Sequence, residues 1–177
     1  VNPIAPKYLP NEESVNELSK VLIENLLEFD ESSTNSTTKF FTDAVEGLIG
    51  GMIWKLKTSY PQYCTLPHLI AVFQSMTTKR LIAFLSSNIT SKSMASAFIN
   101  GMDSDKQTAG VKSTLANAFK KIGSQQLFMV LSKDEVPLNI NSKDNPSVIC
   151  IVNHPKYESA YSPIIAAIMH TVIKQMS

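Results

Sequence analysis

The chain has 177 residues, an apolar fraction of 44% and a formal net charge of +1 at pH 7. This length suffices for one ordinary domain, or for one domain and part of another, and the composition is typical of an ordered globular protein. Every apolar run is well short of the ~20 residues that a membrane-spanning helix needs, and no signal peptide precedes the first helix, so we expect a soluble segment.

Residues 1–11 predict an extended lead-in, because three prolines in the first ten residues disfavour both helix and inner strand. Asn11 can cap a helix whose first turn holds Glu12 and Glu13, where the helix dipole favours acidic side chains. Because the chain starts at Val1 and not at a methionine, we also expect an internal piece of a longer protein.

The longest helical pattern covers residues 39–56, KFFTDAVEGLIGGMIWKL, and predicts a core helix around which the other elements pack. Gly47, Gly50 and Gly51 each cost about 1 kcal/mol relative to alanine inside a helix, which indicates that another backbone packs closely there. Shorter helices are predicted over residues 66–75, 78–87, 91–102 and 105–122, so residues 12–123 form a multi-helix, all-α domain.

The pattern changes after residue 123. The short apolar run 127–131 and the β-branched run 147–152 predict strands, and residues 160–176 predict a mostly apolar helix. A buried strand followed by such a helix is half of a βα unit. The fold class is therefore predicted to be mainly α, with residues 124–177 forming part of an incomplete α/β domain.

Charge is distributed unevenly along the chain. Residues 1–46 contain nine acidic and three basic side chains, whereas residues 79–133 contain eight basic and two acidic ones. The basic stretch indicates either a surface for nucleic acid or an acidic partner, or the ordinary solvated faces of helices. The candidate contact residues are Lys79, Arg80, Lys92, Lys106, Lys112, Lys120 and Lys121.

No catalytic, cofactor-binding or metal-binding residue is predicted. His68, His154 and His170 lie far apart in the sequence, and Cys64 and Cys150 are expected to be reduced rather than paired, as in a cytoplasmic chain. No Gly-Lys dipeptide occurs, so the chain has no P-loop for nucleotide phosphates. The Asp134-Glu135 pair resembles a Mg²⁺-holding strand end, but Ser132, Lys133 and the following proline favour a solvated turn.

Several short motifs together resemble the TraG/TraD-type coupling proteins of type IV secretion, especially conjugative-transposon members from Bacteroides-like bacteria. An aromatic pair followed by alanine opens the long helix, and a YP…TLPHL turn leads into the next one. The residues concerned are Phe40, Phe41, Ala44, Tyr60, Pro61, Thr65, Leu66, Pro67, His68 and Leu69. Three further motifs resemble the same family. Asn2-Pro3-Ile4 resembles its entry into the helical domain, and Asn153-x-Pro155 and Tyr161-Ser162-Pro163, before a helix ending in Lys174-Gln175, resemble its return to the nucleotide-binding domain.

The resemblance implies that an all-α domain is inserted in a RecA-like ATPase domain, with the nucleotide-binding motifs outside this chain. The implied parent is a hexameric bacterial ATPase, anchored at the inner membrane, that binds ATP and Mg²⁺ and passes relaxase-bound single-stranded DNA or protein to the secretion channel. This chain would be its substrate-facing helical domain and not itself an enzyme. The alternative is a helical protein–protein interaction module or adaptor with no nucleic-acid contact; an independent enzyme comes third.

Overall fold

A computed structural model describes residues 1–27, 36–101 and 105–176. All regular structure in these ranges is helical, which confirms the prediction of a mainly α chain. The elements in chain order are η1 (Pro6–Tyr8), α1 (Glu12–Leu26), α2 (Ser36–Ser59), η2 (Pro61–Tyr63), α3 (Leu66–Ser75), α4 (Thr78–Ser86), α5 (Ile89–Met94), α6 (Ser96–Asn100), α7 (Asp105–Ile122), α8 (Gln125–Leu131), η4 (Pro155–Tyr157) and α9 (Glu158–Met176).

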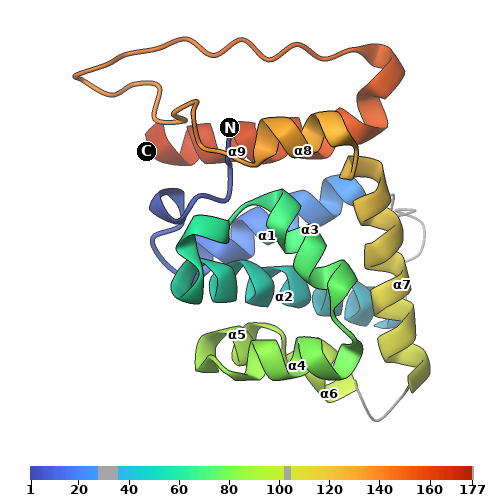
Figure 1. The fold of residues 1–177 in the computed structure, drawn as a ribbon. Coiled ribbons are helices and arrows are strands. Elements are labelled where there is room, and N and C mark those ends of the chain that lie inside the picture. The colour runs from blue at the N-terminus through green and yellow to red at the C-terminus, as the bar shows by residue number, and fades with distance from the viewer. Residues whose placement is uncertain (28–35, 102–104, 177) are drawn as a thin grey trace.

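Helix α2 is central, as its periodicity predicts. It packs against α1 on one side and against α5 and α6 on the other, while α9 covers α1 and α7 runs along one end of these layers (Figure 1). The side chains of its apolar stripe are buried, namely Ala44, Val45, Leu48, Ile49, Met52, Ile53 and Leu56. Burial of this stripe supplies the main driving force for assembling the layers.

The glycines of α2 allow the close helix packing that the sequence predicts. A Cβ atom on Gly47 would lie 2.3 Å from the carbonyl oxygen of Met94, and one on Gly51 would lie 2.8 Å from the carbonyl oxygen of Ser91. Any larger side chain at these two positions would collide with the backbone of α5. The prediction of a neighbouring backbone is therefore confirmed for Gly47 and Gly51.

Local capping sets several helix starts. The Asn11 side chain accepts a hydrogen bond from the backbone N–H of Ser14, and the Ser14 hydroxyl accepts one from the Asn11 N–H, which forms a reciprocal capping box at α1. At α3, the Thr65 side chain accepts from the His68 N–H and Pro67 occupies the first turn. The Asn11 cap lies where the sequence predicts it.

The first eleven residues differ from the predicted extended lead-in. Pro6–Tyr8 form a 3₁₀ turn, and Ile4 and Leu9 are buried in the core. The Asn2 amide donates to the Cys64 carbonyl oxygen at 2.8 Å. The segment is thus an integral part of the packed structure. Its apolar side chains are buried in the core, and its polar groups form hydrogen bonds with residues far along the chain.

The strand predicted at residues 127–131 is wrong, because these residues lie in helix α8. The Ser124 side chain caps the helix by accepting from the Leu127 N–H, and Leu127 and Leu131 are buried one turn apart. Phe128, Met129 and Val130 are exposed. Only Leu127 and Leu131 of this run are buried, and their spacing of four residues fits one side of a helix, whereas one face of a strand would also include Met129.

The strand predicted at residues 147–152 is also absent. These residues are extended and mostly exposed, and their only backbone hydrogen bond to the rest of the described chain runs from the Ser147 N–H to the Ile140 carbonyl oxygen, at 2.9 Å. A strand requires a neighbouring strand that pairs with its backbone N–H and C=O groups, and the described ranges contain no other strand. The helix predicted over residues 160–176 is confirmed as α9.

Helix α9 joins the C-terminal part of the chain to its start. Its Thr171 hydroxyl hydrogen-bonds to the Pro3 carbonyl oxygen at 3.1 Å, and Ile164 and Ala167 belong to the same apolar core as the residues of α1 and α2. Thus the core extends across residue 123, where the sequence predicts a boundary. No described helix is both long enough and apolar enough to cross a membrane.

Candidate functional site

The seven predicted contact residues lie on three helices. Lys79 and Arg80 occupy the first turn of α4, Lys92 lies on α5, and Lys106, Lys112, Lys120 and Lys121 lie on α7. Lys106 and Lys120 are fourteen residues apart on α7, which corresponds to about 21 Å at the helical rise of 1.5 Å per residue. The structure therefore distributes these residues over an extended surface and does not gather them in a pocket.

Two of the lysines have structural roles. The Lys112 ammonium donates to the carbonyl oxygen of Met76, the C-cap residue of α3, at 3.1 Å. The Lys121 ammonium donates to the carbonyl oxygen of Leu26, the last residue of α1, at 3.2 Å. A cation at the carbonyl end of a helix complements the helix dipole, so both lysines stabilise helix ends in the fold.

The other five basic residues are exposed: Lys79, Arg80, Lys92, Lys106 and Lys120. None of them forms an ion pair with a carboxylate in residues 1–27, 39–101 or 106–176. The Lys112 contact with Met76 places α7 beside the junction between α3 and α4. This contact brings the start of α4, which carries Lys79 and Arg80, close to α7.

A wider feature of the sequence reinforces this charge. Residues 47–102 contain no aspartate or glutamate, but they contain five basic residues. This stretch forms the second half of α2, η2 and α3–α6, so α4, α5 and α6, at the bottom of Figure 1, contain no carboxylate. The prediction based on residues 79–133 missed this longer stretch, although counting acidic residues alone reveals it.

The same part of the fold contains an aromatic pair that sequence reasoning missed, in which Tyr60 is exposed and Phe84 is partly buried against the core. The rings of Tyr60 and Phe84 are stacked, with centroids 6.3 Å apart and planes inclined by 17°. The Lys55 ammonium lies 5.8 Å from the centroid of the Phe84 ring. Tyr60 follows α2 and Phe84 belongs to α4, so only the packing of these helices brings the two rings together.

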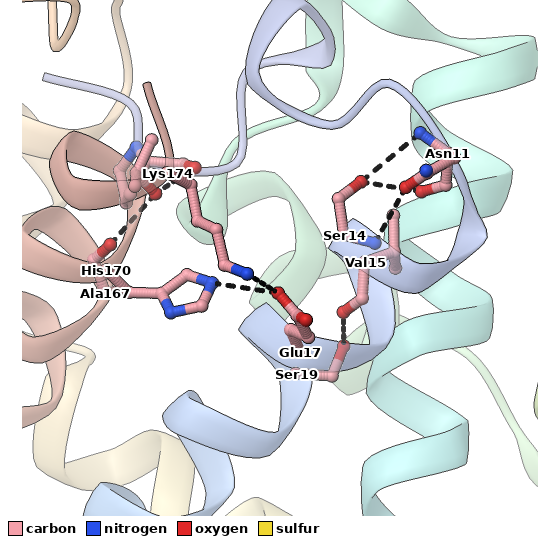
Figure 2. A network of polar contacts seen from close by, with 10 residues as sticks. Asn11, Ser14, Val15, Glu17, Ser19, Ala167, His170 and Lys174 are labelled. Carbon is pink, nitrogen blue, oxygen red and sulfur yellow. Dashed lines mark hydrogen bonds and ion pairs between the residues drawn. The ribbon is translucent and has the colours of Figure 1, made fainter. Parts of the chain in front are cut away.

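A second polar cluster lies between α1 and α9. The Glu17 carboxylate is 2.6 Å from the Lys174 ammonium and 4.0 Å from Nε2 of His170, and Figure 2 shows these three side chains converging. They line a cleft of about 280 Å³ whose wall also includes Tyr8 and Asn11. The Lys174 hydrogen bond lowers the pKa of Glu17, whereas burial lowers the pKa of His170.

The chemistry of this cleft favours a structural role. Of its two carboxylates, Glu17 is paired with Lys174 and Glu13 accepts a hydrogen bond from the Asn11 amide. No group of three His, Cys, Asp or Glu side chains that could hold a metal occurs among the described residues. Of the two cysteines, Cys64 is buried and Cys150 is exposed, and both are free thiols. Neither cysteine lines this cleft.

Comparisons with known proteins identified no relative: no family model, no curated protein and no solved structure matches the chain.

Proposed function

We propose that the chain is the substrate-facing helical domain of a conjugative type IV secretion coupling protein, and that it contacts single-stranded DNA or the relaxase attached to it. The observation that carries the proposal is the set of exposed basic residues on α4, α5 and α7, together with the absence of any carboxylate from α3, α4, α5 and α6. Such a surface attracts polyanions without any need for a catalytic group.

The positions of the family-like motif residues support the same proposal. Ala44 is buried in the central helix, Pro61 begins the turn after it, and Thr65, Pro67 and Leu69 form the buried start of α3. These residues thus pack and cap helices, as expected of motif residues in a helical domain. No residue of this chain is proposed to bind ATP or Mg²⁺; these would bind elsewhere in the hexameric, inner-membrane-anchored parent.

Residues 124–177 would, in that parent, belong to its RecA-like α/β domain. The extended run 147–152 is β-branched, and residues 148–152 make no backbone hydrogen bond to the rest of the described chain. Its exposed side chains include Val148 and Val152. Pairing with strands of the parent would satisfy both the free backbone groups and the exposed apolar side chains.

The test is a titration of a fluorescent single-stranded 15-mer of thymidines at low and at physiological salt. Binding should weaken with salt, because cationic side chains release counterions from the phosphates. The variants Lys79→Glu/Arg80→Glu and Lys106→Glu/Lys120→Glu should bind more weakly. Each phosphate contact that a variant removes should make the slope of log K against log salt shallower by about 0.7.

A matched control is Lys143→Glu/Lys156→Glu, which makes the same charge change at exposed positions outside the basic surface. It should bind as the wild type does apart from a small effect of net charge. Equal loss of binding in this control and in the two test variants would contradict a localised DNA surface. Binding that does not respond to salt would contradict phosphate contacts altogether.

The second candidate function is a protein-binding helical module without nucleic-acid contact, and an apolar surface favours it. Phe128, Met129 and Val130 of α8 are exposed, and an apolar cleft of about 230 Å³ lies between α8, Ile151 and α9. Under this function, the chain would not bind single-stranded DNA at low salt, and substitution of Met129 by a charged residue would abolish partner binding.

A further inference from the structure

The Tyr60–Phe84 pair has the geometry of a flat aromatic surface. An inclination of 17° at a centroid distance of 6.3 Å is an offset stack, and 44% of Tyr60 remains exposed. The Tyr60 hydroxyl makes no hydrogen bond to other described residues, so the ring is held by stacking and by its place directly before η2. Ring surface is thus available to another flat, conjugated group.

Two cationic side chains flank this pair. Lys55 lies over the Phe84 ring, and Arg80 precedes Phe84 by four residues on α4, so their side chains are neighbours on that helix. No acidic residue occurs anywhere in residues 47–102, which include every element of this surface. A ligand that joins flat conjugated rings to negative charges would therefore match both features.

Unpaired nucleic acid has this combination of chemistry. Proteins that bind single strands place aromatic side chains against successive bases and cationic side chains along the phosphates. A duplex cannot use such a surface, because its bases are already stacked within the helix. A folded acidic protein could pair with Arg80, but it would not require an exposed tyrosine ring stacked on a second, partly buried ring.

We propose that Tyr60 and Phe84 form a stacking platform for unpaired bases of single-stranded DNA, and that Arg80 contacts an adjacent phosphate. This proposal rests on the DNA-contacting form of the proposed function and adds the residues that contact the bases. It also assigns a path to the strand: from the platform along α4, past Arg80 and Lys79, to the junction where Lys112 of α7 meets Met76.

The test compares two fluorescent 15-mers of equal charge, one of thymidines and one of abasic nucleotides. The wild type should bind the thymidine strand more tightly. Tyr60→Ala should raise its Kd at least about fivefold, in keeping with the usual energy of one aromatic–base stack. The abasic strand should bind Tyr60→Ala and the wild type equally, because it retains the phosphates and lacks the bases.

Two control variants separate stacking from folding. Tyr60→Phe keeps the ring and should bind as the wild type does, and Tyr157→Ala removes a tyrosine of similar exposure, 46%, outside the platform and should change nothing. Phe84→Leu keeps an apolar side chain and removes the second ring, so it should also weaken binding of thymidines selectively. Circular dichroism and thermal unfolding of each variant verify the fold.

The outcomes distinguish this proposal from the proposed function. Unchanged thymidine binding in Tyr60→Ala, together with weaker binding in Lys79→Glu/Arg80→Glu, overturns the platform and leaves the basic DNA surface intact. Equal losses for thymidine and abasic strands also overturn it, because stacking cannot act on absent bases. If the wild type binds neither strand at low salt, the platform and the DNA-contacting function both fail.

Discussion

The Glu17 carboxylate of α1 and the Lys174 ammonium of α9 lie 2.6 Å apart, and they connect the first and last α-helices of the chain. His170, one turn before Lys174, lies beside the same carboxylate (Figure 2). Because both members of the ion pair are about half exposed, the pair contributes less to stability than the apolar α1–α9 contact beneath it. The cluster also makes stability depend on pH, through His170.

Stability should fall on acidification from pH 7 toward pH 5, partly through His170. Burial lowers the pKa of His170 below its ordinary value of 6.5; nearby Lys174 also lowers it and Glu17 opposes both effects. The unfolded chain therefore binds more protons than the folded chain just below pH 6.5, and protonation favours unfolding. Urea unfolding of His170→Gln should show a smaller fall over this range, whereas His154→Gln, at an exposed position, should behave as the wild type does.

Gly47→Ala should destabilise the protein by about 1–3 kcal/mol, although alanine is the better helix former. The added methyl group would lie 2.3 Å from the Met94 carbonyl oxygen, so α2 and α5 would have to separate. The control is Gly101→Ala, whose methyl group would have no neighbour closer than 3.9 Å. Chemical denaturation measures both; a Gly47→Ala variant as stable as the wild type would contradict the observed helix packing.

Tyr8→Phe should destabilise the protein by about 1–3 kcal/mol, because it leaves a buried donor without a partner. The Leu138 N–H donates to the Tyr8 hydroxyl at 2.9 Å in the interior, and this bond attaches the segment after α8 to the start of the chain. Tyr63→Phe, at a 48% exposed position, should change stability by less than about 0.5 kcal/mol. Equal stability of the two variants would show that the Tyr8 bond contributes nothing.

The two thiols should react at very different rates. Cys64 is buried, and burial raises its pKa to about 12, so almost no thiolate is present or accessible at pH 8. Cys150 is exposed. Mass spectrometry after brief treatment with N-ethylmaleimide should therefore find one modification, on Cys150, and two after denaturation. Cys150→Ser should remain unmodified while folded; rapid labelling of that variant would place Cys64 at the surface.

The helices that sequence predicts best are those with strong local signals. Asn11 and Thr65 cap helices whose apolar side chains recur at a helical period, and all these interactions join residues within a few positions of one another. The five-residue run 127–131 is too short for its period to distinguish strand from helix, and its assignment as a strand fails. The run 147–152 has the composition of a strand, but composition cannot supply a neighbouring strand.

The candidate site is only partly predictable for the same reason. Charge counting identifies all seven basic residues, but it cannot tell that Lys112 and Lys121 are bound to helix ends while Lys79 and Lys120 face solvent. Charge counting also cannot predict that the Tyr60 ring stacks on the Phe84 ring of α4. These facts depend on how helices are arranged, which local sequence does not encode.

The sequence by itself thus determined the helical character of the chain, the central helix with its close-packed glycines, and the absence of acidic residues from 47–102. Only the tertiary structure decided that α8 is helical, that residues 1–11 enter the core, and that Tyr60 stacks on Phe84. The physical reason is the range of the interactions: caps and periodicity act within one or two helical turns, whereas burial and ring stacking join residues distant in the chain.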